Sequence, residues 1–146
     1  MSHWTATTTA NATPEQVLNV LTRPDEIQRW APVDFDLEDW RRLSAGTRTR
    51  VSGRLAGVPV EFDVEVHHAD EAGLQLSADG PIGIDVRYEL AHADVGSELN
   101  ASVSLRDGGG LTGRLVSKAT KAMLSAGALE GAAGRIARAA EVAIAA

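Results

Sequence analysis

The last third of the chain carries a helical pattern that follows a long series of strand-like segments, and this order is the strongest constraint on the fold. From Leu111 to Ala146 there is no proline, and apolar residues recur every three or four positions. We expect one helix here, with Lys121, Arg135 and Arg138 pointing away from its apolar stripe. The stripe comprises Leu111, Leu115, Ala119, Ala122, Ala126, Leu129, Ala133, Ile136, Ala140 and Ile144. Because half of these side chains are alanine, the helix can lie close to a sheet and still leave a pocket.

The segments before this helix have the character of β-strands. Segment 3–10 is rich in threonine, and the others alternate apolar and polar residues with a period of two, as half-buried strands do. The alternating segments are 34–38, 48–55, 58–66, 74–76, 84–90 and 99–105. We therefore expect an antiparallel sheet with one apolar and one polar face.

Two hairpins can be placed by matching apolar and charged residues across the strands. A two-residue turn at Ala56-Gly57 brings apolar residues opposite each other, and it pairs arginines with carboxylates on the other face. The expected pairs are Leu55 with Val58, Val51 with Phe62, Thr49 with Val64, Arg50 with Asp63, and Arg48 with Glu65. A turn at Val95-Gly96 predicts two further pairs, Leu90 with Ala101 and Tyr88 with Val103.

Two short helices are expected after the first strand. Thr13 and Gln16 form a capping box at the start of the first helix. Pro24 opens the second helix, which carries Trp30 and is stopped by Pro32. Trp30 therefore either borders a pocket or attaches this helix to the sheet, and the sequence favours neither reading.

Composition and charge exclude several classes of function. The net charge of −6 argues against sequence-independent nucleic-acid binding and against docking on anionic lipid surfaces. The chain has no apolar run long enough to span a membrane, so no stable membrane insertion is expected, and it has no signal-peptide pattern. With no cysteine there are no disulfides or thiolate metal sites. We expect a cytoplasmic protein, and the abundance of Ala, Gly and Arg suggests a bacterial source.

Three stretches together resemble the START/Bet v 1-like (SRPBCC) superfamily, which includes START lipid-transfer domains, plant allergens and polyketide cyclase/dehydrase proteins. They are the opening 12–30, the hairpin entry from Gly46 to Leu55, and the glycine break at Gly108 before the final helix. The resemblance covers residues 1–146 as a single domain. It implies an α+β helix-grip fold, in which a curved seven-stranded antiparallel sheet surrounds a long C-terminal helix. It also implies binding of lipids, sterols, polyketides or hormones, or catalysis of a cyclisation.

Our first hypothesis is a non-catalytic protein that binds an apolar small molecule, such as a lipid, an isoprenoid or a polyketide-like compound, between sheet and helix. Tyr88 and His68 are the candidate polar contacts, because both share the apolar face of their strands. The complete set of candidate ligand-binding residues is Trp30, Phe35, Phe62, Val64, His68, Val86, Tyr88, Val103, Met123 and Leu129.

The alternative hypothesis is a polyketide cyclase or dehydratase that uses Tyr88 or a cavity histidine, His68 or His92, as acid or base. The low aromatic content argues against it. No metal site or cofactor is expected, since no HExxH-like spacing or phosphate loop is present. Gly127, Gly131 and Gly134 share one sector of the final helix. Close approach of a loop, close approach of a second subunit in a homodimer, or simple tolerance would each explain them.

Overall fold

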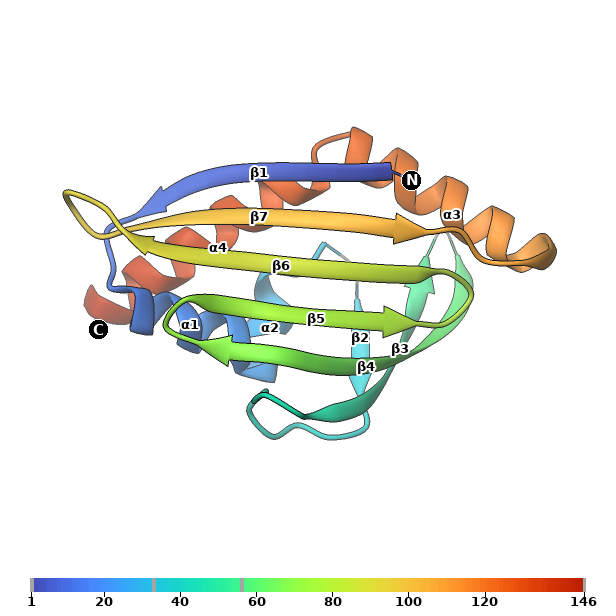
Figure 1. The fold of residues 1–146 in the computed structure, drawn as a ribbon, viewed down its shortest axis with the longest axis horizontal. Coiled ribbons are helices and arrows are strands. Elements are labelled where there is room, and N and C mark those ends of the chain that lie inside the picture. Colours follow the sequence, from blue (N-terminus) through green and yellow to red (C-terminus); the bar gives the residue numbers. More distant parts are fainter. Residues whose placement is uncertain (1, 33, 56, 146) are drawn as a thin grey trace.

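The computed structural model describes residues 2–32, 34–55 and 57–145, and in this part of the chain one sheet lies against four helices (Figure 1). The strands are β1 (Ser2–Ala10), β2 (Phe35–Leu37), β3 (Arg48–Leu55), β4 (Val58–Asp70), β5 (Gly73–Asp79), β6 (Gly83–His92) and β7 (Ser97–Arg106). The helices are α1 (Pro14–Thr22), α2 (Pro24–Trp30), α3 (Gly110–Ser125) and α4 (Ala128–Ala145).

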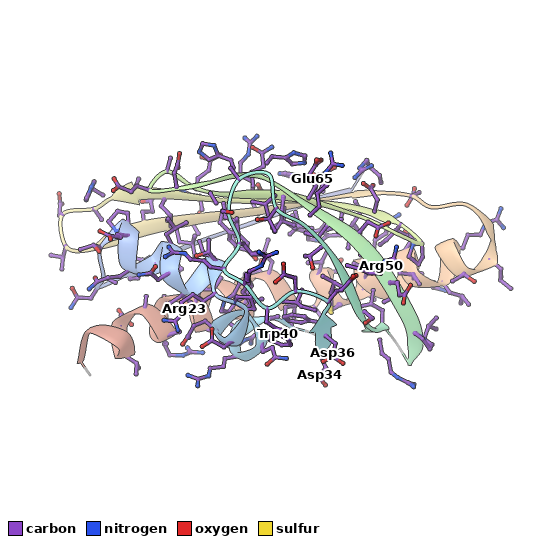
Figure 2. All side chains as sticks on the ribbon, turned by 90° about the horizontal axis from the view of Figure 1, so that it is seen from below. Arg23, Asp34, Asp36, Trp40, Arg50 and Glu65 are labelled. Atoms are coloured by element: carbon purple, nitrogen blue, oxygen red, sulfur yellow. The ribbon has the colours of Figure 1, made fainter. Side chains whose placement is uncertain are left out.

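The sheet has seven strands in the order β1-β7-β6-β5-β4-β3-β2, and all neighbouring strands are antiparallel. The helices all lie on one side of the sheet, and the strands β2 and β3 bend towards them (Figure 2). Helix α4 packs against β1 and β7 and against both short helices. The expected α+β helix-grip architecture is therefore confirmed.

The alternation predicted for the strands sets which residues enter the core. Along β7 every second residue is buried: Ser97, Leu99, Ala101, Val103 and Leu105. The residues between them are half-buried. Phe62 and Val66 of β4 and Tyr88 and Leu90 of β6 extend the same buried face, so the apolar side of the sheet faces the helices.

The hairpin predictions had different outcomes. In β3–β4 each predicted pair is found, including Val51 opposite Phe62 and Arg50 opposite Asp63. In β6–β7 the predicted register is wrong by two residues, because Tyr88 lies opposite Ala101 and Leu90 opposite Leu99. The loop there is longer than a two-residue turn, since His92 pairs with Ser97. A shift of two keeps each side chain on its own face, so face matching alone could not detect it.

The prediction of one unbroken final helix is also wrong. The helix stops at Ser125, and Gly127 takes a left-handed conformation with φ of +99° before α4 begins. This break rotates the buried stripe of α3, so that Leu111 and Leu115 are 76% and 53% exposed. The α3 residues that are buried instead are Gly113, Val116, Ser117, Thr120 and Leu124. The predicted stripe is correct in α4, where Leu129, Ala133, Ile136 and Ala140 are buried.

The short helices begin as expected. Thr13 accepts a hydrogen bond from the backbone N–H of Gln16, and the Gln16 side chain accepts one from the backbone N–H of Thr13. Arg135 of α4, which was expected to point away, donates from Nε to the carbonyl of Trp30 at 2.9 Å and so attaches α2 to α4.

None of the described helices combines the length and the apolar character that crossing a membrane requires.

Candidate functional site

Two adjoining chambers lie between the sheet and the helices. The first, the α4 chamber, has a volume of about 250 Å³ and is bordered by the strands β2 to β7 and by α3 and α4. The second, the Trp30 chamber, has a volume of about 230 Å³ and is bordered by α1, α2 and the strands β2 to β6. The residues that line both chambers are Phe35, Val51, Val64, Val86 and Tyr88. Because they share these walls, the two spaces are direct neighbours.

The chambers bring together nearly all of the candidate residues from the sequence. The α4 chamber is lined by Phe35, Phe62, Val64, Val86, Tyr88, Val103, Met123 and Leu129. Trp30 lines the Trp30 chamber. The alternation of apolar and polar residues in the strands had predicted which sheet residues face the helices, and these are the ones that line the chamber. Sequence reasoning did not single out Thr49, Thr120 and Ala132, which also line the chambers.

His68 was expected to face the cavity, but the structure places it on the surface. The register between β4 and β5 shifts between Val66 and His68, so His68 no longer shares the face of Val66. Its side chain is about half exposed, and Nε2 lies 2.8 Å from Oδ2 of Asp70. His92, at the end of β6, is exposed as well. Neither histidine is among the residues that line the chambers.

Trp30 has both of the roles that the sequence left open. Its indole Nε1 donates to the backbone carbonyl of Val20 at 2.9 Å, which fixes α2 against α1. Its ring meets the Tyr88 ring edge to face, with 5.7 Å between the centroids and 80° between the planes. This contact makes a rigid aromatic corner in the chamber wall.

Tyr88 and Thr49 carry hydroxyl groups in the wall of the Trp30 chamber. Burial raises the pKa of the Tyr88 phenol, so the side chain remains a neutral hydroxyl group. The Thr49 hydroxyl is buried and lacks a hydrogen-bond partner among the described residues. A buried hydroxyl without a partner costs about 1–3 kcal/mol in the free energy of folding.

The α4 chamber opens towards a surface groove. The groove has a volume of about 860 Å³ and runs beside β2 and the ends of β3 and β4. Pro32, Asp34, Phe35, Gly53 and Arg54 line both the groove and the chamber. Figure 2 shows Asp34 and Asp36 together beside β2. The groove is wide and polar, so we interpret it as the entrance and the apolar chambers as the site.

Charged groups elsewhere are organised as surface pairs rather than as a catalytic cluster. Arg48 contacts Glu65 at 2.8 Å and Arg50 contacts Asp63 at 3.2 Å on the outside of the sheet, as the hairpin register predicted. Within the described ranges, no group of three or more His, Asp or Glu side chains could hold a metal ion. The chambers therefore offer mostly apolar contact, with the hydroxyl-bearing side chains of Tyr88, Thr49 and Thr120 in the walls. Asp34 and Arg54 line the α4 chamber where it meets the groove.

The family model described as "Polyketide cyclase / dehydrase and lipid transport" matches residues 1–141. No curated protein matches the chain. Among solved structures, TTHA0849 from Thermus thermophilus is 17% identical with a TM-score of 0.75, over 97% of this chain and 99% of that one. A START superfamily protein from Mycobacterium smegmatis is 16% identical with a TM-score of 0.62, over 92% and 98%.

DynU16, from the dynemicin biosynthetic locus, is 20% identical with a TM-score of 0.65. The match covers 98% of this chain and 48% of DynU16, so the present chain spans about half the length of that protein. At these identities the three solved structures show a shared fold and do not identify a ligand.

Proposed function

The chain belongs to the polyketide cyclase/dehydrase and lipid transport family, and from this premise we propose that it binds one small, uncharged and largely apolar molecule in the joined chambers. The observation that carries the proposal is the lining. Apolar side chains from the sheet and from all four helices surround most of the space, and the neutral side chain of Tyr88 lines both chambers. Burial of a charged ligand group there would be unfavourable without a counter-charge.

The size of the chambers restricts the ligand further. Typical small-molecule pockets have volumes of about 300–1,000 Å³, and each chamber alone is below that range. A ligand that occupies both would be a compound of two or three fused rings or a short isoprenoid. A long-chain lipid would have to displace wall residues or extend through the groove. We therefore favour a compact ring system or a short isoprenoid with one hydroxyl or carbonyl group.

The alternative, a cyclase or dehydratase, is supported by the family description and by the location of the Tyr88 hydroxyl in the chamber wall. Tyr88 can donate a hydrogen bond to a carbonyl group. Its raised pKa, however, makes it a poor general base near neutral pH. Both candidate histidines lie on the surface. Binding without turnover is thus the function that the geometry supports better.

A matched set of probes tests this proposal by calorimetry. We expect 2-naphthol, which is neutral and carries a hydroxyl group, to bind more tightly than naphthalene, and the anion 2-naphthoate to bind most weakly. Thr49→Val and Tyr88→Phe should each reduce the advantage of 2-naphthol over naphthalene by roughly two- to tenfold, as loss of one hydrogen bond requires.

Native mass spectrometry after gentle purification should in addition show an uncharged apolar passenger. Tighter binding of 2-naphthoate than of 2-naphthol, or no binding of any probe together with no passenger, would contradict the proposed function.

A further inference from the structure

Helix α3 has two faces of different character, and only one of them packs against the protein. The inner face contributes Thr120, Met123 and Leu124 to the wall of the α4 chamber. On the outer face Leu111 and Leu115, one helical turn apart, are 76% and 53% exposed. The other exposed residues of that face are Arg114, Lys118, Ala122 and Ser125. At its N-terminal end the helix extends beyond the strands, so the outer face is open to an external surface (Figure 1).

The charge around this face is opposite to that of the whole chain. From Gly108 to Leu129 the sequence contains Arg114, Lys118 and Lys121 and no acidic residue, although the net charge of the chain is −6. Lys121 is held by Asp107 at 3.2 Å. Arg114 and Lys118 form no ion pair with any residue in the described ranges. On the sheet, in contrast, Arg106 is neutralised by Asp79 and Asp85 at 3.0 Å each.

We propose that the outer face of α3 docks on an anionic lipid bilayer. Leu111 and Leu115 would enter the boundary between headgroups and acyl chains, and Arg114 and Lys118 would contact lipid phosphates. Apolar side chains that enter the boundary of headgroups and acyl chains, together with Lys and Arg that attract anionic lipids, are what bind a helix to the membrane interface. The net charge of −6 led us to expect no docking on anionic lipids. Net charge, however, does not reveal where on the surface the cationic residues lie.

Charge decides against a second copy of the chain as the occupant. In a two-fold contact through this face, Arg114 and Lys118 of one copy would approach those of the other. Asp107, which borders the same surface hollow, is already paired with Lys121. A bilayer with anionic lipids supplies both the apolar layer and the negative charge that the face lacks. Since the opposite side of α3 lines the α4 chamber, docking would hold the chamber wall next to a source of apolar molecules.

Vesicle flotation with the full chain tests this inference. We expect the protein to float with vesicles of phosphatidylcholine and phosphatidylglycerol in equal parts, to remain unbound with pure phosphatidylcholine, and to dissociate as salt is raised. Two double variants, Leu111→Ser with Leu115→Ser and Arg114→Gln with Lys118→Gln, should each weaken binding roughly tenfold or more. The matched control is Val95→Ser, which removes an apolar side chain that is 71% exposed in the β6–β7 loop and should not alter flotation.

The same variants separate this inference from the proposed function. All of them change exposed residues outside the chambers, so 2-naphthol affinity and the circular dichroism spectrum should be unchanged. Equal binding to both kinds of vesicle, or no binding to either, would overturn the docking proposal and leave ligand binding intact. A dimer that the leucine variants abolish would assign the face to a second copy and overturn the proposal as well.

Discussion

At the scale of single residues, Tyr88 offers a direct spectroscopic test because it is the only tyrosine in the chain. Burial favours its neutral form and raises its pKa. We expect little tyrosinate absorbance near 295 nm at pH values where an exposed phenol, with a pKa of about 10, is half ionised. In urea the transition should return to the ordinary value. Ionisation near pH 10 in the folded protein would mean that the phenol is open to water.

This shift also predicts how stability depends on pH. Because the folded-state pKa is above the unfolded-state pKa, the unfolded chain releases its proton first as pH rises. The contribution to stability is therefore fully present below about pH 10 and is lost at higher pH. Urea unfolding of the protein and of Tyr88→Phe should give free energies that differ in their slope above pH 10 and not below it.

Trp30 should stabilise the fold by more than the burial of its apolar surface alone. Trp30→Phe removes the indole N–H and leaves the buried carbonyl of Val20 without that donor, at a cost of about 1–3 kcal/mol in the free energy of unfolding. Trp40→Phe is the matched control, since Trp40 is 46% exposed and the change should stay within about 0.5 kcal/mol. If both variants lost the same free energy of unfolding in urea, the hydrogen bond of Trp30 would not contribute to stability.

At the scale of elements, the break between α3 and α4 can be tested by two alanine substitutions. Gly127→Ala places a Cβ on a left-handed residue and should destabilise the protein by about 1–2 kcal/mol. At Gly134 a new Cβ would meet only Arg138 Nη1 at 3.8 Å, so Gly134→Ala should stabilise by about 0.5–1 kcal/mol. Thermal unfolding should therefore shift in opposite directions. Shifts of the same sign would contradict the assigned break.

The elements also show what the sequence could and could not reveal. Strand faces followed from alternation, and the β3–β4 register followed because apolar and charged pairs agreed on one alignment. The β6–β7 register did not follow from the sequence, because Leu90 has an apolar partner in the predicted alignment (Ala101) and also in the observed one (Leu99). The helix break was missed because alanine is compatible with either side of a helix. The bulge before His68 was missed because a single inserted residue leaves no pattern in a short run.

The site was predictable to the same extent. The apolar walls followed from strand faces, and Tyr88 followed from its position in β6. The role of Thr49 was not apparent, because a threonine on an apolar face is common in strands and its missing partner is a property of the folded surroundings. The outer face of α3 was assigned to the core, because the predicted stripe was continued across Gly127.

At the scale of the whole molecule, the unfilled space between the layers can be tested with two neighbouring alanines of α4. Ala132 and Ala133 are both at most 2% exposed, but only Ala132 lines the α4 chamber. Ala132→Leu should occupy part of the chamber, abolish 2-naphthol binding and change the unfolding free energy by less than about 1 kcal/mol. Ala133→Leu should overpack the core and cost about 1–3 kcal/mol. If both variants were equally destabilised, the chamber would be closed in solution.

The pairing of β1 with β7 has a consequence for biosynthesis. Ser2 lies opposite Leu105, and β1 also packs against α4, so the first of the seven strands to be synthesised waits for the last of them and for the helix that follows it. Until then its edge and the apolar side of the unfinished sheet stay uncovered. Such long-range closure slows folding and exposes nascent chains to aggregation. Translation that stalls before β7 should therefore leave a chain that depends on chaperones.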